Sequence, residues 1–184
     1  VYTPEEADMV GSPYADRKYM TGRYACSACA LGCGAFYDVN DGTYPIGHTY
    51  RPEYETAAVF TSMIAVKDPA VYIYCNDLCN RYGFDTISAG ATIAWVMECY
   101  ENGALTKEDL DGIEAHWGSG EATVALLKKM GTAEGCGKVL LHGSQYAAEH
   151  WKKGQEYLMT YSGIEPGIHD ARFFPGMART FQFD

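Results

Sequence analysis

Long hydrophobic runs are absent from this sequence of 184 residues. No apolar stretch reaches the roughly 18 residues that a membrane-spanning helix needs, so we expect no membrane partner. Basic residues are also scarce: 14 lysines and arginines stand against 24 aspartates and glutamates, which gives a formal net charge of −10. Because the lysines and arginines form no cluster, the composition argues against a nucleic acid partner.

The sequence also lacks an even number of cysteines and a recognisable signal peptide. Seven cysteines make a poor disulfide framework, and free thiols fit a reducing compartment. We therefore expect a cytoplasmic protein. With 47% hydrophobic and 21% charged residues, the chain has the composition of a globular protein. Its length suffices for one domain with a core, or for two small ones.

Three cysteines lie close together in a run of small residues. Cys26, Cys29 and Cys33 have C-x2-C-x3-C spacing, and alanine, serine and glycine fill most positions around them. A backbone of small residues can wrap closely around a group held by three sulfurs, and iron–sulfur clusters take thiolate ligands from such loops. Zinc is the main alternative. The explanation that invokes no metal is three unligated thiols in a turn.

The remaining cysteines and histidines offer few further ligands. Cys75 and Cys79 lie four residues apart on the apolar stripe of an expected helix, which favours buried core thiols over metal ligands. His48 follows Cys33 by fifteen residues and would complete a Cys3His zinc site.

The distribution of prolines, glycines and capping residues predicts a mainly α, multihelical domain with a short irregular or hairpin segment after the cysteines. We expect residues 1–23 to be an irregular lead-in and 24–184 to form one helical domain. The expected hairpin or extended loop covers 34–52, and helices are expected over 53–65, 69–82, 86–102, 120–130 and 144–151. A Thr-Lys-Glu-Asp capping box at 106–109 predicts another short helix.

Several motifs occur together in one order along the chain. They are Arg-Pro-Glu-Tyr-Glu-Thr at 51–56, Asn-Arg-Tyr-Gly-Phe-Asp-Thr-Ile-Ser at 80–88, Met-Glu-Cys-Tyr at 97–100, His-Trp-Gly at 116–118 and Ile-His-Asp-Ala-Arg at 168–172. With the three cysteines, this sequence resembles the middle portion of tungsten-containing aldehyde:ferredoxin oxidoreductases.

The resemblance implies cofactor ligands. Cys26, Cys29 and Cys33 would hold a [4Fe-4S] cluster together with a fourth cysteine far downstream. None of the other cysteines has the expected context for this fourth ligand, and Cys136, between two glycines, is the best local substitute. The family's pterin-binding D-x-x-G-L-(C/D) element reads Asn80-Arg-Tyr-Gly-Phe-Asp85 here, so Asn80 and Asp85 would contact the pterin. Asn80 replaces the usual aspartate, and an amide can still donate and accept hydrogen bonds.

The resemblance also implies catalytic residues. Glu53 would be the general base on the attacking water, with Glu55 the less favoured candidate. His169 would bind the carbonyl or relay a proton. Without the resemblance, Glu53 is a first-turn glutamate that complements a helix dipole, and His169 is a loop histidine paired with Asp170.

The reaction implied is the oxidation of an aldehyde and water to a carboxylic acid at a tungsten bis-pterin centre, with molybdenum as the alternative metal. Electrons would leave through the cluster to ferredoxin or a similar carrier. The family's amino-terminal pterin domain and its downstream half are missing, so we expect a fragment that works with the remaining segments or subunits. Alone it should show no aldehyde-dependent dye reduction.

Two readings outside this enzyme class stay open. One is a stand-alone helical module that binds zinc or an iron–sulfur cluster without catalysis. The other is a helical packing domain with no bound metal. The oligomeric state, including a homo-oligomer, is not fixed by the sequence.

Overall fold

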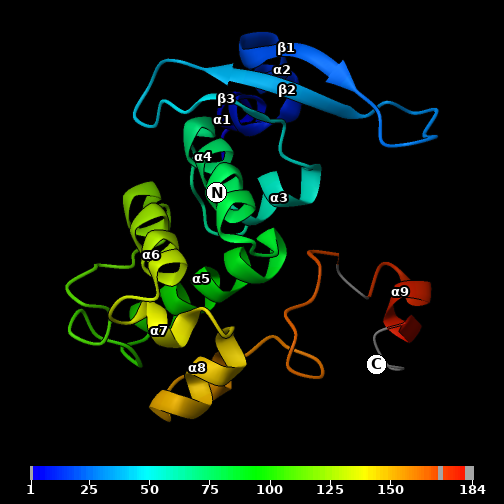
Figure 1. Ribbon diagram of the computed structural model, residues 1–184. Coiled ribbons are helices and arrows are strands. Elements are labelled where there is room, and N and C mark those ends of the chain that lie inside the picture. The colour runs from blue at the N-terminus through cyan, green and yellow to red at the C-terminus, as the bar shows by residue number, and fades with distance from the viewer. Residues whose placement is uncertain (1, 170–171, 181–184) are drawn as a thin grey trace.

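The computed structural model describes residues 2–169 and 172–180, which form a mainly helical body with a small antiparallel sheet at one end (Figure 1). The sheet has the order β1-β2-β3. The helices are α1 (Pro4–Val10), α2 (Ser12–Tyr19), α3 (Tyr54–Val59), α4 (Pro69–Tyr82), α5 (Thr86–Glu101), α6 (Gly120–Thr132), α7 (Gly137–Leu140), α8 (Ser144–Trp151) and α9 (Pro175–Thr180), with a 3-10 turn at Gln155–Tyr157. The strands are β1 (Met20–Tyr24), β2 (Gly34–Val39) and β3 (Gly47–Tyr50). The prediction of a mainly helical fold is therefore confirmed, with a three-stranded sheet beside the helices.

The expected irregular lead-in at 1–23 is wrong, because this segment forms α1, α2 and β1. The Thr3 hydroxyl accepts a 3.2 Å hydrogen bond from the Glu6 amide, and the Glu6 carboxylate accepts one of 2.8 Å from the Thr3 amide. This reciprocal capping box starts α1, and Pro4 occupies its first turn. The prolines of this segment begin helices rather than interrupt them.

The predicted hairpin at 34–52 is present as β2 and β3, and β1 pairs with the other edge of β2. Burial alternates along β2: Ala35, Tyr37 and Val39 are buried, and the residues between them are partly exposed. The buried side faces α2 and the helical body. Thr49 of β3 donates a 3.0 Å hydrogen bond to the Asp77 carboxylate, which ties the sheet to α4.

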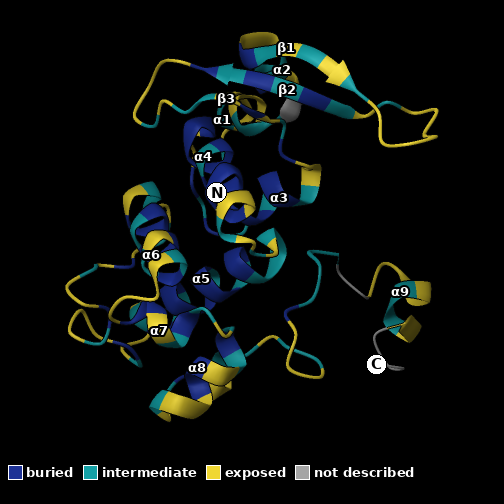
Figure 2. Ribbon diagram, in the orientation of Figure 1, coloured by how far each residue is buried: buried dark blue, intermediate teal, exposed yellow. Residues whose placement is uncertain are grey.

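Helices α4, α5 and α6 form the core of the body, as the dark ribbons of Figure 2 show. Asp68 caps α4 through a 2.9 Å hydrogen bond from the Ala70 amide. Gly83 ends the helix with φ +75°, a left-handed conformation that glycine adopts without strain. Asp85 and Ser119 cap α5 and α6 in the same way. These three predicted helices are confirmed.

The helix expected over 53–65 is shorter, because α3 ends at Val59. The hydroxyls of Thr61 and Ser62 donate hydrogen bonds to the carbonyls of Ala57 and Ala58, and such bonds compete with continuation of a helix.

At 106–109 the bonds of the capping box form, with 2.9 Å from the Thr106 amide to the Asp109 carboxylate. Only turns follow, because Asp111 and Gly112 adopt positive φ. In the described part of the chain, no helix is long and apolar enough to cross a lipid bilayer.

Candidate functional site

The three clustered cysteines lie on the loop 25–33 that connects β1 with β2 and projects beyond the sheet (Figures 1 and 2). Cys26, Cys29 and Cys33 are all exposed free thiols. The Cys29 amide donates a 3.0 Å hydrogen bond to the Cys26 carbonyl. Ala28 and Gly32 have φ near +60°, so small residues occur where the loop turns.

The donor chemistry of this loop fits an iron–sulfur cluster, since thiolates on a short loop of small residues are its usual ligands. The loop does not form a closed ligand set by itself. Among the described residues, no group of three or more histidine, cysteine, aspartate or glutamate side chains is arranged to hold a metal ion. The cysteines therefore stay predicted ligands, and the loop offers up to three of them.

The other four cysteines are chemically different from these three. Burial raises the pKa of the Cys79, Cys99 and Cys136 thiols to about 12, and that of Cys75 well above its usual value. They remain protonated members of the core. The proposal of Cys136 as a fourth cluster ligand does not agree with this placement, because it is 5% exposed in the helical body, next to α7.

We expect a thiol-alkylating reagent to separate the two groups in native, metal-free protein. Cys26, Cys29 and Cys33 should react within minutes at pH 8, because they are accessible and the thiolate is the reactive form. The four buried thiols should react only after unfolding. Peptide mass spectrometry after a timed pulse of iodoacetamide measures this, and rapid labelling of Cys136 would contradict the described core.

His48 is not placed to complete a zinc site with the loop. It pairs with Asp38 across the β2–β3 ladder, and Asp38 is five residues along β2 from Cys33. At about 3.3 Å per residue, these five residues put Asp38, and with it His48, roughly 16 Å from Cys33 along the strand. The His48 Nδ1 is 2.7 Å from the Asp38 carboxylate, and its ring stacks on Phe36.

Arg51 connects the cysteine loop to the next part of the site, which sequence reasoning missed. Its guanidinium donates a hydrogen bond to the Cys33 carbonyl and another, of 3.2 Å, to the Asp16 carboxylate. Its amide donates to the Ala35 carbonyl at 2.8 Å. Arg51 directly precedes the Pro-Glu-Tyr-Glu-Thr run. This position beside a family motif is the sequence feature that could have identified Arg51 as a site residue. Arg23, the basic residue nearest to Cys26 in the sequence, is exposed.

The start of α3 meets His169 from the far end of the chain. The Tyr54 hydroxyl forms a 3.0 Å hydrogen bond with the His169 Nε2, and the Glu55 Oε1 lies 4.0 Å from the same nitrogen. Glu55 also accepts a 2.8 Å hydrogen bond from the Ile168 amide, which holds the backbone beside His169.

Glu53, the predicted general base, is placed differently. It is the exposed N-cap residue of α3, and its side chain makes no capping hydrogen bond. The structure thus brings Glu55, and not Glu53, to His169. Asp170, the alternative partner of the histidine, lies outside the described residues.

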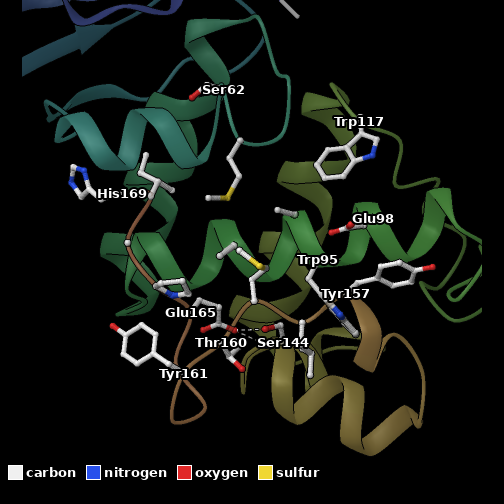
Figure 3. A pocket seen from close by; sticks show the side chains of 18 of the residues that line it. Ser62, Trp95, Glu98, Trp117, Ser144, Tyr157, Thr160, Tyr161, Glu165 and His169 are labelled. Atoms are coloured by element: carbon white, nitrogen blue, oxygen red, sulfur yellow. Dashed lines mark hydrogen bonds between the residues drawn. The ribbon is translucent and has the colours of Figure 1, made fainter. Parts of the chain in front are cut away.

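His169 lines a pocket of about 940 Å³ that runs between α5 and the segment 157–169 (Figure 3). Most of the wall is apolar or aromatic. Glu165, 6% exposed, fixes the segment: its Oε1 accepts hydrogen bonds from the Ser144 amide at 2.7 Å, the Ser144 hydroxyl at 2.6 Å and the Thr92 hydroxyl at 3.2 Å. The loop that carries His169 is thereby anchored to α5 and α8.

The two predicted pterin contacts lie near each other around the α4–α5 junction. Asn80 is exposed on the last turn of α4. Asp85 is exposed and caps α5 by accepting a 2.7 Å hydrogen bond from the Ser88 amide. Asp85 also borders a recess of about 150 Å³. Helix termination at Gly83 and capping by Asp85 are thus observed, and contact with a pterin stays a prediction.

Comparison with known proteins gives one consistent result. Residues 2–183 match the family model described as aldehyde ferredoxin oxidoreductase, domains 2 and 3. The tungsten-containing aldehyde ferredoxin oxidoreductase of Pyrococcus furiosus is 34% identical over 156 residues, covering 84% of this chain and 25% of that protein. The aliphatic sulfonate oxidoreductase, WOR-like subunit, of the same organism is 30% identical over 173 residues, covering 91% and 27%.

A solved structure shares the fold. The active site complex BamBC of benzoyl coenzyme A reductase, in complex with 1,5 dienoyl-CoA, superimposes with a TM-score of 0.73 at 21% identity, covering 89% of this chain and 24% of that one. The chain spans about a quarter of the length of the relatives that it matches. Because the family model matches nearly the whole chain, the chain belongs to the aldehyde ferredoxin oxidoreductase family, in the part that forms domains 2 and 3.

Proposed function

We propose that this chain takes part in oxidising an aldehyde to a carboxylic acid, with water supplying the added oxygen atom and the two electrons leaving through a [4Fe-4S] cluster to ferredoxin in the cytoplasm. One observation carries the proposal: Tyr54, Glu55 and His169 meet beside a large apolar pocket. A carboxylate next to a histidine is a suitable acid–base pair, and the pocket can hold an organic substrate. Membership of the family supports the same reaction.

In this proposal Glu55 replaces Glu53 as the general base. Its Oε1 is held by the Ile168 amide and lies near the His169 ring. A carboxylate in this position can take a proton from the water that attacks the carbonyl carbon. Tyr54 orients His169, and the imidazole donates a hydrogen bond to the carbonyl oxygen or passes the proton to solvent.

The cofactor residues have separate tasks. Cys26, Cys29 and Cys33 would hold the cluster. The Asn80 amide would donate hydrogen bonds to the pterin of a tungsten or molybdenum centre and accept them from it, and the Asp85 carboxylate would accept them. When bound, the metal and its pterins supply the two-electron oxidation itself. The other family segments, or separate subunits, would supply the remaining ligands.

The test is aldehyde-dependent reduction of ferredoxin or of a viologen dye by the full-length protein, purified without oxygen. We expect turnover that needs both aldehyde and the reducible acceptor. Absence of turnover in a preparation that contains iron and tungsten or molybdenum would overturn the proposed reaction.

A further inference from the structure

The floor of the large pocket is one stripe of α5. Ala91, Ala94, Trp95 and Glu98 all line the pocket and follow the i, i+3, i+4, i+7 spacing of one helix face. Seven residues of helix cover about 10 Å at 1.5 Å per residue. Two alanines leave room over the first half of this length, and a tryptophan and a carboxylate occupy the second.

The aromatic residues near Glu98 present ring faces and few free donors. The Trp95 indole nitrogen donates to the Gly154 carbonyl at 2.9 Å, and the Trp117 indole nitrogen donates to the Glu101 carboxylate at 2.8 Å. Because both indole hydrogens are engaged, these residues can offer a ligand only ring surface. Trp117 is partly exposed, whereas Trp95 is 4% exposed and stacks on Trp151, so it offers only the part of its ring that borders the pocket. The electron-rich face of an indole attracts cations more strongly than that of any other side chain.

Glu98 carries the carboxylate at the end of the pocket that Trp95 and Trp117 line (Figure 3). It is partly buried, and among the described residues its side chain has no hydrogen bond or ion pair. Glu165, by contrast, is engaged by Ser144 and Thr92. No buried side-chain oxygen of the described residues lacks a hydrogen-bond partner, so the Glu98 carboxylate reaches the water of the pocket and is available to pair with a bound cation.

His169 and Glu98 lie at opposite ends of the pocket. Figure 3 places His169 at one end and Glu98 at the other, between Trp95 and Trp117. Among the described residues that line the pocket, His169 and Arg172 are the basic ones. In the proposed reaction the aldehyde lies at the His169 end. The opposite end carries the Glu98 carboxylate between two indole rings, and Glu165, which also lines the pocket, is already held by Ser144 and Thr92.

From this arrangement we propose that Glu98 is a specificity-determining residue, which selects substrates with a cationic amine or quaternary ammonium group at the end opposite the aldehyde. Trp95 and Trp117 would face the cation, and the alanine stripe would pack against a flat apolar body between the two ends. The inference rests on the proposed aldehyde oxidation for the identity of the reacting group, and the binding of the cationic end can be measured without it.

The first experiment measures binding to the full-length protein by calorimetry. The probe is benzyltrimethylammonium, and its uncharged isostere neopentylbenzene is the comparison. We expect the cation to bind at least about tenfold more tightly than the isostere, and Glu98→Gln to remove this preference. Glu108→Gln, which removes an exposed carboxylate outside the pocket, should leave it unchanged. Equal binding of the two probes, or no binding because another part of the protein fills the pocket, would overturn the inference.

The second experiment uses turnover and separates the two proposals. Wild-type protein should show a kcat/KM at least about tenfold higher for 4-(trimethylammoniomethyl)benzaldehyde than for 4-neopentylbenzaldehyde, and Glu98→Gln should lower only the former. Equal values in wild type contradict the role of Glu98. If neither aldehyde is oxidised while the cationic probe still binds through Glu98, the proposed reaction fails and the cation site stands.

Discussion

Glu55→Gln is expected to lower kcat for aldehyde oxidation by a factor of about 10² to 10⁴, the usual contribution of a positioned general base. Glutamine has nearly the shape of glutamate, and its carbonyl oxygen can still accept the hydrogen bond from the Ile168 amide. The segment that carries His169 should therefore keep its place, while the proton acceptor is lost. The measurement is anaerobic steady-state reduction of a viologen dye at saturating aldehyde.

Glu53→Gln is the matched control, because Glu53 is two residues away, exposed and without a capping bond. We expect it to retain kcat within about twofold, as exposed sites away from the chemistry usually do. The reverse pattern, a large loss at Glu53 and a small one at Glu55, would show that the contact of α3 with His169 is not the catalytic one.

Gly137→Ala is expected to destabilise the fold by at least about 3 kcal/mol, beyond the ordinary cost of overpacking. A Cβ at Gly137 would lie 2.0 Å from the Lys129 carbonyl oxygen and 2.1 Å from its carbonyl carbon. These are backbone atoms of α6, so no side-chain rotation can relieve the overlap. Helices α6 and α7 would have to separate, and the core around Met130 and Leu140 would open.

Gly176→Ala is the control for this prediction, since a Cβ there meets nothing within 4 Å. We expect its apparent melting temperature to stay within about 1 °C of wild type, and that of Gly137→Ala to fall by at least about 6 °C. Equal melting temperatures for the two variants would mean that α6 and α7 do not approach as closely as described.

Much of the helical body could be predicted because its helices carry local stop and start signals. Asp68, Gly83, Asp85 and Ser119 act at the positions that capping chemistry indicates. Residues 1–23 could not be assigned in the same way. Prolines and glycines there are compatible with loops and with helix starts, and the decisive evidence is the reciprocal bonding of Thr3 and Glu6.

The contact between Glu55 and His169 is harder to predict than the helices. Glu53 and Glu55 lie in the same short motif, and which of them reaches His169 depends on where α3 begins. His169 is 114 residues beyond Glu55, so their contact is a property of the tertiary fold and not of local spacing. Likewise, the role of Arg51 depends on a carbonyl eighteen residues earlier in the chain. The cysteine spacing predicted a metal ligand loop, and the apolar stripe of α4 predicted that Cys75 and Cys79 are core thiols. Neither pattern showed that Cys136 is buried.

We infer that the loop 25–33 and the start of α3 serve one tungsten or molybdenum iron–sulfur oxidoreductase. The most direct test is metal analysis with EPR spectroscopy of the full-length protein, purified and reduced without oxygen. We predict four irons and one tungsten or molybdenum per chain, with a reduced-cluster signal that disappears in Cys29→Ser. One tightly held zinc, with no iron and no visible absorption, would contradict the account.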